Sequence, residues 1–118
     1  MIQPRHGLDA LSCFVMTTLN RPDLGVLLED AAKVFAVLGA PMRLRILSSL
    51  CHGEKNVGQL LADVQTTQPN VSQHLNLLYR AGLLRKRRDG VQIFYAIADD
   101  HVVRICQAMC EHVATRRH

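Results

Sequence analysis

The chain has 118 residues, 48% of them hydrophobic, and this length suffices for one domain with a buried core. Its 14 basic and 10 acidic residues give a formal net charge of +4, which favours an anionic partner. No apolar run approaches the roughly 18 residues that a membrane-spanning helix needs. We therefore expect a cytoplasmic protein, in which the four cysteines are thiols, redox sensors or metal ligands rather than structural disulfides.

Residues 1–25 are the least regular part of the chain. Apolar residues recur at helical spacing from Leu8 to Leu19, which predicts a short amphipathic helix. Three breakers follow it: Asn20, Pro22 and Gly25. We do not interpret this segment as a signal peptide, because Asp9 interrupts the apolar stretch and no A-x-A cleavage site follows. We expect an N-terminal arm that contributes to dimer packing.

Two further helices are expected before residue 53. An apolar stripe predicts a helix from Leu27 that ends at Gly39. Pro41 can begin the next helix, since its missing N–H is harmless in a first turn, and this helix is predicted to run to His52. Because it is apolar on more than one side, we expect it to be the central buried element.

A short helix, a tight turn and a longer helix come next. Asn56 can cap a helix that runs through Val64, and Gln65–Thr67 form a three-residue turn. The longer helix lies within Thr66–Gly82, where the threonines can cap its start and the glycine can follow its end. This order is typical of a helix-turn-helix unit.

The longer helix has one apolar stripe and an extended polar face. The stripe consists of Val71, Leu75 and Leu78. Amide, hydroxyl and guanidinium groups can contact base edges or phosphates, which makes this a candidate DNA-recognition helix. The candidate contacts are Thr67, Gln68, Asn70, Ser72, Gln73, Asn76 and Arg80. Taken alone, the window is equally compatible with an ordinary solvated helix.

A β-hairpin is predicted after Gly82. Leu83–Arg88 and Val91–Ile97 flank Asp89-Gly90, a dipeptide typical of a type I′ turn. Four consecutive cations occupy the first strand: Arg85, Lys86, Arg87 and Arg88. Such a wing could contact sugar and phosphate beside a groove. The alternative is that the charges only keep an edge hairpin soluble.

The chain ends in a predicted amphipathic helix. Asp99 can cap it, and it should extend to about Arg116. Its apolar stripe consists of Val102, Ile105, Cys106, Met109 and Val113. A terminal helix this apolar needs a second surface that covers its stripe, and the same helix of a twofold-related copy would provide it most simply.

Three segments together resemble the ArsR/SmtB family of bacterial winged-helix repressors: LGAPMRLRILSSL, TTQPNVSQHLNLLYRAGLL and RRDGVQIFYAI. The resemblance covers roughly residues 28–114. It implies a mainly α-helical winged helix-turn-helix fold over 26–118, with a β-hairpin wing, a C-terminal dimerisation helix and a homodimer. It also implies a protein that binds palindromic double-stranded operator DNA and leaves it when an inducer binds. The family's recognition positions fall on Gln68, Asn70, Ser72, Gln73 and His74, and its wing positions on Arg87, Arg88 and Gln92.

The resemblance leaves the inducer open between two kinds of site. A known cysteine-pair site at the start of the recognition unit has no counterpart, because 56–60 contains no cysteine. The last-helix zinc pattern is matched by Asp99, His101 and His112, while Thr115 stands where a fourth ligand belongs. In a dimer these residues could meet across two chains, with Glu111 or His118 completing a zinc site. The alternative is that Asp99 only caps the helix and both histidines are solvated.

The cysteines offer the second kind of site. Cys106 and Cys110 are one helical turn apart, close enough to share a soft metal or metalloid ion or to react with an oxidant or persulfide. Cys51 or Cys13 could supply a further sulfur. Persulfide-sensing relatives have a cysteine where this chain has Ser48, which argues against a direct transfer of that mechanism. For Cys51 we favour a small buried hydrophobe.

Two other classes of function are alternatives to a DNA-binding regulator. A thiol- or zinc-dependent enzyme would need a nucleophile with its base or an open metal site, and no motif specifies either. A winged-helix module that binds only protein would have no need of four consecutive cations. The sequence therefore predicts a DNA-binding regulator and not an enzyme.

Overall fold

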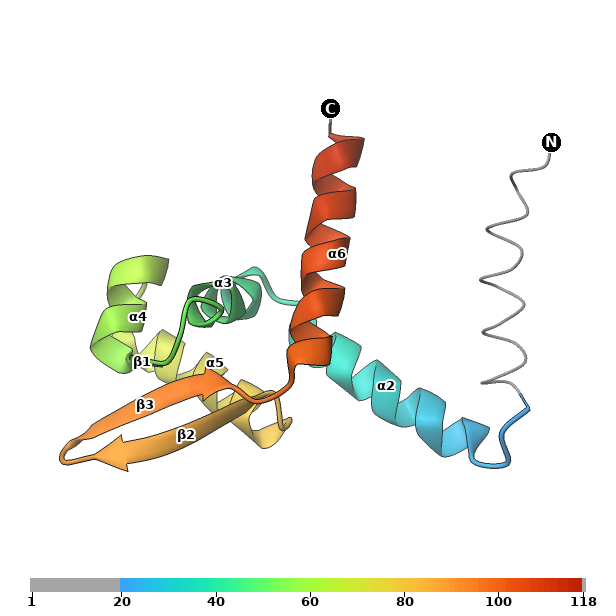
Figure 1. The fold of residues 1–118 in the computed structure, drawn as a ribbon, viewed down its shortest axis with the longest axis horizontal. Helices are drawn as coiled ribbons and strands as arrows, with labels where there is room; N and C mark the ends of the chain where they lie inside the picture. Colours follow the sequence, from blue (N-terminus) through green and yellow to red (C-terminus); the bar gives the residue numbers. More distant parts are fainter. Residues whose placement is uncertain (1–19, 118) are drawn as a thin grey trace. The chain divides into compact units, whose positions relative to one another are not determined.

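The computed structural model describes residues 20–117 and contains five helices and three short strands in that range (Figure 1). The chain divides into two compact units, residues 1–34 and 35–118, and each is treated by itself. The predicted helix between Leu8 and Leu19 lies outside the described residues, so the expected arm over 1–25 stays a prediction. None of the helices in the described range is long and apolar enough to cross a membrane.

Helix α2 (Leu24–Leu38) begins earlier than the sequence predicted. The chain turns at Arg21–Asp23, and the Leu27 N–H donates to the carbonyl of Asp23 (3.0 Å) as the first intrahelical bond. Gly25 therefore lies in the first turn of the helix, and its interpretation as a breaker was wrong. The first-turn N–H groups have no intrahelical acceptor anyway, so a glycine there removes little.

Helix α3 (Pro41–Leu50) is the central buried element, as predicted. Ile46, Leu47 and Leu50 are at most 2% exposed. The helix ends two residues before the predicted His52, because the N–H groups of His52 and Gly53 donate to carbonyls three residues back instead of the four of an α-helix. Gly53 then turns the chain at a φ of 130°, a conformation that only glycine adopts readily.

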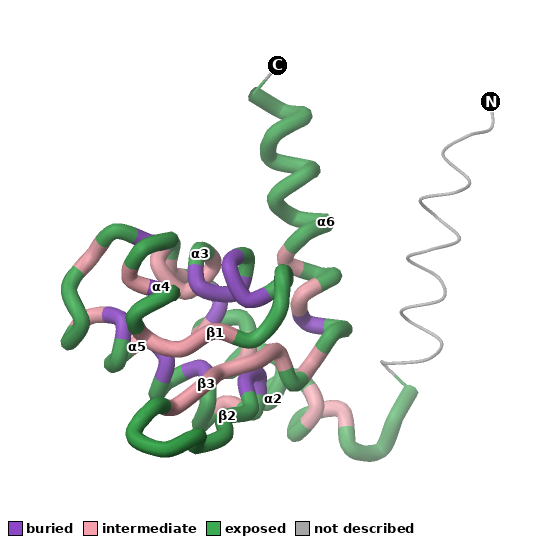
Figure 2. Tube along the Cα trace, turned by 60° about the vertical axis from the view of Figure 1, so that its left-hand side comes forward, coloured by how far each residue is buried: buried purple, intermediate pink, exposed green. Residues whose placement is uncertain are grey.

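Helices α4 (Val57–Val64) and α5 (Gln68–Arg80) form the predicted helix-turn-helix. Asn56 and Gln59 make a reciprocal capping box at the start of α4, which satisfies two N–H groups that the helix leaves without partners. Gln65 is left-handed at the end of α4, and the Thr67 hydroxyl caps α5. Packing of α3, α4 and α5 on one another encloses the core, where Figure 2 shows most of the buried residues.

The wing is a three-stranded antiparallel sheet in the order β1-β3-β2. The two-residue strand β1 (Lys55–Asn56) pairs with β3 (Gln92–Ile97) and was not expected from the sequence. Strand β2 (Leu84–Asp89) pairs Asp89 with Gln92, so the turn residues are Gly90-Val91 rather than the predicted Asp89-Gly90. Only the first turn residue has a positive φ (65°), which excludes type I′ and is typical of type II′.

Helix α6 (Asp100–Arg116) is capped by Asp99, whose Oδ1 accepts from the Val102 N–H (3.2 Å). Of its predicted apolar stripe only Val102 is buried. Ile105, Met109 and Val113 are 50%, 58% and 42% exposed in the single chain, and Figure 2 shows the helix mostly in the exposed colour. An exposed apolar stripe of this kind is typical of interaction surfaces.

Candidate nucleic-acid interface

Helix α5 presents a polar face to solvent opposite a fully buried stripe. Val71, Leu75 and Leu78 have no exposed surface, as the sequence predicted. The helical period of 100° per residue places Gln73, Asn76 and Arg80 on the opposite side, and all three are exposed. Ser72 and Gln68 are also exposed, nearer the start of the helix. These side chains could enter a groove of double-stranded DNA without disturbing the hydrophobic core.

Three of the predicted contacts are engaged within the protein. The Asn70 side chain donates to the Thr66 hydroxyl (3.1 Å), and its backbone N–H donates to the Thr67 hydroxyl (3.3 Å). His74 lies 3.1 Å from a guanidinium nitrogen of Arg43 and is half-buried. Asn70, Thr67 and His74 therefore hold α5 in position in this structure. The solvent-exposed face of α5 consists of the other predicted contact residues.

Arg43 is a residue whose role the sequence did not reveal. Its Nε donates to the carbonyl of Val37 (2.5 Å) while its Nη1 faces His74, so one side chain joins the end of α2 to α5. Burial, and then the Arg43 charge, lower the pKa of His74, so the imidazole is the neutral partner. The helical spacing could have predicted this role, because Arg43 lies on the same stripe of α3 as Leu47 and Leu50 and therefore faces the protein interior.

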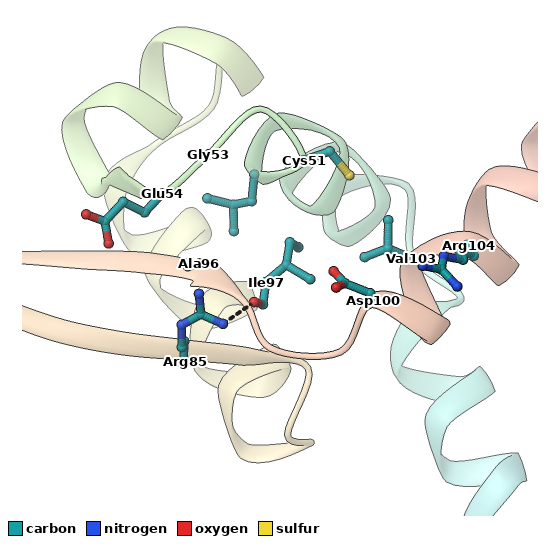
Figure 3. A pocket seen from close by; sticks show the side chains of 10 residues that line it. Cys51, Gly53, Glu54, Arg85, Ala96, Ile97, Asp100, Val103 and Arg104 are labelled. Carbon is teal, nitrogen blue, oxygen red and sulfur yellow. Dashed lines mark hydrogen bonds between the residues drawn. The ribbon is translucent and has the colours of Figure 1, made fainter.

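The four cations of β2 lie on two faces of the wing. Successive side chains of a strand alternate, so Arg85 and Arg87 share one face and Lys86 and Arg88 share the other. Arg85 donates to the carbonyl of Ile97 (2.6 Å), as Figure 3 shows beside the cleft next to Cys51. The run is therefore not one uniform patch.

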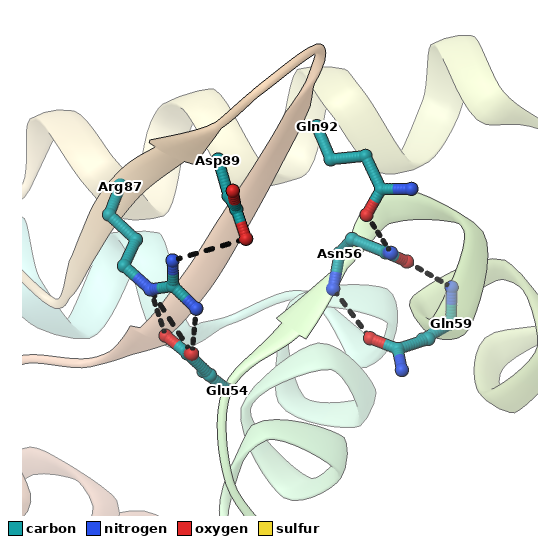
Figure 4. A network of polar contacts seen from close by, with 6 residues as sticks. All are labelled: Glu54, Asn56, Gln59, Arg87, Asp89 and Gln92. Carbon is teal, nitrogen blue, oxygen red and sulfur yellow. Dashed lines mark hydrogen bonds and ion pairs between the residues drawn. The ribbon is translucent and has the colours of Figure 1, made fainter.

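Arg87 is held by an acidic residue of the loop after α3. Its Nε donates to both carboxylate oxygens of Glu54 (3.0 and 3.1 Å), and its Nη2 donates to one of them (2.5 Å), as Figure 4 shows. The hydrogen bonds from Arg87 lower the pKa of Glu54. The guanidinium also lies 4.7 Å from the centre of the Phe94 ring. These contacts tie the exposed Arg87 side chain to Glu54 at the protein surface and leave less of its charge for a phosphate.

Lys86 and Arg88 face the other way. Lys86 lies over the ring of Tyr79 at the end of α5, 4.3 Å from its centre. Within residues 20–117, Arg88 makes no hydrogen bond, ion pair or cation–π contact. At the tip, Val91 is 98% exposed. Arg88 and the tip are thus the parts of the wing that remain available to a nucleic acid.

Gln92 is tied to the start of the helix-turn-helix. Its Oε1 accepts a hydrogen bond from the Asn56 side chain (3.0 Å), whose oxygen in turn caps α4 through the Gln59 N–H (2.8 Å; Figure 4). The predicted wing contact therefore also fixes the wing against α4. Glu54 and Asn56 were both missed as wing supports, since their partners lie more than thirty residues away in the chain.

The predicted zinc ligands do not meet within one chain. Asp99 caps α6, and His101 and His112 are exposed and about 16 Å apart along the helix axis, given 1.5 Å per residue. No three His, Cys, Asp or Glu side chains within 20–117 lie close enough to hold a metal ion. A site from these residues would need a second chain. Cys13 and His118 lie outside the described residues.

Three thiols come together between α3 and α6. Cys51, Cys106 and Cys110 line one cleft of about 330 Å³. The pKa of the Cys106 thiol is raised, first by burial and then by the neighbouring thiols of Cys110 and Cys51. Cys51 is exposed, so its interpretation as a buried hydrophobe was wrong. The reason is that α3 ends at Leu50 and releases Cys51 from the buried stripe.

Comparison with known proteins agrees with this geometry. Residues 40–86 match the model of the arsR family of bacterial regulatory proteins. The chain is 38% identical over 84 residues to an uncharacterised HTH-type transcriptional regulator of Methanocaldococcus jannaschii, covering 70% of this chain and 94% of that protein. It is 38% identical over 80 residues to the biofilm growth-associated repressor of Agrobacterium fabrum, covering 68% of each.

A solved structure shares the fold. The homodimeric winged helix-turn-helix DNA-binding domain of Mycobacterium bovis, described as a possible ArsR-family transcriptional regulator, has a TM-score of 0.68 at 30% identity. The match covers 81% of this chain and 88% of that one. The chain belongs to the ArsR/SmtB family and is a winged helix-turn-helix transcriptional regulator, not an enzyme.

Proposed function

We propose that the chain is a homodimeric repressor that binds a palindromic operator and releases it when a metal or metalloid ion or a thiol-reactive species binds. The observation that carries the DNA-binding part is the exposed face of α5, with Gln73, Asn76 and Arg80 outward and Arg88 on the neighbouring wing. Amide and guanidinium groups can form paired hydrogen bonds with base edges, and Arg88 supplies charge for a phosphate.

The homodimer is supported by α6. Three large apolar side chains on it are 42–58% exposed in the single chain: Ile105, Met109 and Val113. Pairing of this stripe with the same stripe of a second copy removes it from water and sets two α5 helices at a fixed separation. The spacing expected of such a dimer is one turn of DNA, about 34–36 Å.

The sensing part is supported by two sets of residues. Asp99, His101 and His112 could complete a zinc site only across two chains, whereas Cys51, Cys106 and Cys110 already share a cleft. A signal molecule can drive release only if it binds the DNA-incompetent dimer more tightly than the competent one. The local gathering of the thiols favours the cysteine set.

Competition binding tests the DNA-binding part. Reduced protein is titrated onto a labelled duplex from the region upstream of its own gene, against a scrambled duplex of the same composition. We expect the promoter duplex to bind at least about 1,000-fold more tightly, as is typical of specific sites. Gln73→Ala should reduce the discrimination by about 1–3 kcal/mol, whereas the matched Gln107→Ala on α6 should not. Equal affinity for both duplexes would instead support a module that binds only protein.

A further inference from the structure

One arginine side chain connects three helices. Arg43 lies in the first turn of α3, and its Nε donates to the carbonyl of Val37 near the end of α2 (2.5 Å). Its Nη1 lies 3.1 Å from Nδ1 of His74 on α5, and both side chains are half-buried. Because a guanidinium can only donate, this contact requires His74 Nδ1 to accept. The imidazole is therefore neutral, with its one proton on Nε2.

This contact lies at the edge of the surface by which α5 packs on the core. At 100° per residue, His74 is about 60° from Val71 and about 40° from Leu78, which are both fully buried. The bond to Arg43 therefore limits rotation of α5 about its own axis. Side chains reach about 5–6 Å from a helix axis, so a rotation of about 20° moves their ends by about 2 Å. That exceeds the range of about 0.5 Å that a hydrogen bond tolerates.

Among the described residues, His74 faces one charged group, the guanidinium of Arg43. The elements that pack on α5 are α3, α4 and β2. Their other ionisable side chains are Arg45, Asp63 and the run Arg85–Asp89, and α5 itself adds Tyr79 and Arg80. Asp63 is paired with Lys55. The pKa of His74 is lowered by burial and then by the Arg43 charge, and none of the other groups contributes to that shift. A proton on His74 would therefore meet a cation with no carboxylate to offset it.

We infer that Arg43 holds α5 in its DNA-binding orientation only while His74 is neutral, so that protonation of His74 weakens binding to the promoter. The inference rests on the proposed operator-binding function and gives His74 a positioning role instead of the expected base contact. The proton comes from solvent and adds to Nδ1, the atom that accepts from Arg43. Two donors of like charge then face each other, and their separation removes the limit on rotation of α5.

The sign of the pH dependence distinguishes this role from a direct DNA contact. The DNA-binding form holds one proton fewer per chain. Promoter affinity is therefore complete above the folded-state pKa of His74, which lies below the ordinary value of about 6.5, and is lost as pH falls through it. Below that pKa, log affinity should fall by up to about one per pH unit and per chain. A histidine that touched a phosphate would act oppositely, because its protonated ring adds a charge-assisted hydrogen bond.

A pH series of promoter affinities tests the inference on the reduced full-length protein. Fluorescence anisotropy on a labelled duplex from the region upstream of its own gene covers pH 5 to 8 at constant ionic strength. His74→Asn is the matched variant, because its amide oxygen can accept from Arg43 and takes up no proton. We expect the ratio of wild-type to variant affinity to be at least about fivefold lower at pH 5 than at pH 7.5, the lower end of common couplings. A ratio that stays constant, or rises as pH falls, would overturn the inference.

Substitution of Arg43 tests the other half of the pair. Arg43→Ala should weaken promoter binding at pH 7.5 by at least about fivefold and leave the slope of log affinity against log salt unchanged. A slope shallower by about 0.9 per chain would identify a phosphate contact and overturn the positioning role. The matched Arg45→Ala, which removes an exposed charge from the same helix, should change affinity by less than about twofold. Thermal unfolding confirms that each variant folds; if Arg43→Ala does not, Arg43→Lys replaces it, because one ammonium lacks the fork that reaches both partners.

The titration of His74 itself gives an independent readout. Its ring signal in an NMR spectrum is identified by its absence in His74→Asn. By reciprocity, the pKa of His74 should be lower in the promoter complex than in the free protein, and a pKa raised by the promoter would overturn the inference. If wild type at pH 7.5 does not prefer the promoter over a scrambled duplex, the repressor function has failed. If it does, but the affinity ratio and the pKa do not respond as stated, only this inference has failed.

Discussion

Arg88 and Arg87 are adjacent cations of the wing that should respond differently to salt. Arg88 makes no charged contact within the described residues, whereas Arg87 gives three hydrogen bonds to Glu54. A phosphate contact contributes about 0.9 to the slope of log affinity against log salt. A dimer loses two such contacts, so Arg88→Ala should make the slope of log affinity against log salt shallower by about 1.8. The ratio of wild-type to Arg88→Ala affinity should therefore fall about twelvefold when salt rises from about 50 to about 200 mM.

The matched substitution is Arg87→Ala. If Arg87 stays paired with Glu54 in the complex with DNA, Arg87→Ala should leave the salt slope within about 0.5 of wild type. Displacement of the wing in this variant could still weaken binding by the same factor at every salt concentration. Fluorescence anisotropy over a salt series on one promoter duplex measures both slopes. Equal loss of slope in the two variants would refute the distinction between Arg87, which is paired with Glu54, and Arg88, which is available to a phosphate.

Three further outcomes concern stability. Leu75→Ala should lower the free energy of unfolding by about 2–5 kcal/mol. Leu77 lies on the same helix but is 41% exposed, so Leu77→Ala should lower it by under about 0.5 kcal/mol, and urea titration measures both values. Asn56→Ala should cost about 1 kcal/mol by removing the α4 cap, and an unchanged urea midpoint would contradict that role. Burial, and then the Arg43 charge, hold the pKa of His74 below the ordinary histidine value of about 6.5, so the stability that the neutral imidazole contributes is complete above about pH 6.5 and is lost as pH falls towards the folded-state pKa. Wild type should lose melting temperature relative to His74→Gln between about pH 7 and 5.5, and parallel curves would contradict the buried neutral imidazole.

The helices and their caps were predictable because their signals are local. Asn56, Thr67 and Asp99 each cap the helix that the sequence assigned to them. Each cap joins a side chain to an N–H only three residues further on, so a short window of sequence contains both partners. The recognition helix and the hairpin could be assigned for the same reason.

The contacts that hold the wing could not be predicted in this way. Strand β1 has only the sequence Lys-Asn, which shows no strand alternation, and it forms because β3 lies beside it. Glu54 and Arg87 are thirty-three residues apart, and no periodicity links them. The hairpin register differed by one residue from the prediction because Asp89 pairs with Gln92, which leaves Gly90 as the first turn residue.

The candidate DNA contacts were predicted by residue type more than by orientation. By residue type the polar side chains of α5 form one set, yet Asn70 and His74 bind other parts of the protein while Gln73 and Asn76 face solvent. The orientation of these side chains depends on how α5 packs against α3 and α4, and this packing could not be predicted from the sequence. The cysteine cleft likewise requires α6 to lie beside α3.

A footprint of the reduced protein on its own promoter tests most directly whether two recognition helices read one operator. Hydroxyl-radical cleavage at saturating protein gives the protected positions, and analytical ultracentrifugation of the same complex gives its stoichiometry. The proposed homodimer predicts two chains per duplex and two symmetric protected tracts, with centres about 10–10.5 base pairs apart. A single protected tract with one chain bound, or uniform protection without symmetry, would contradict it.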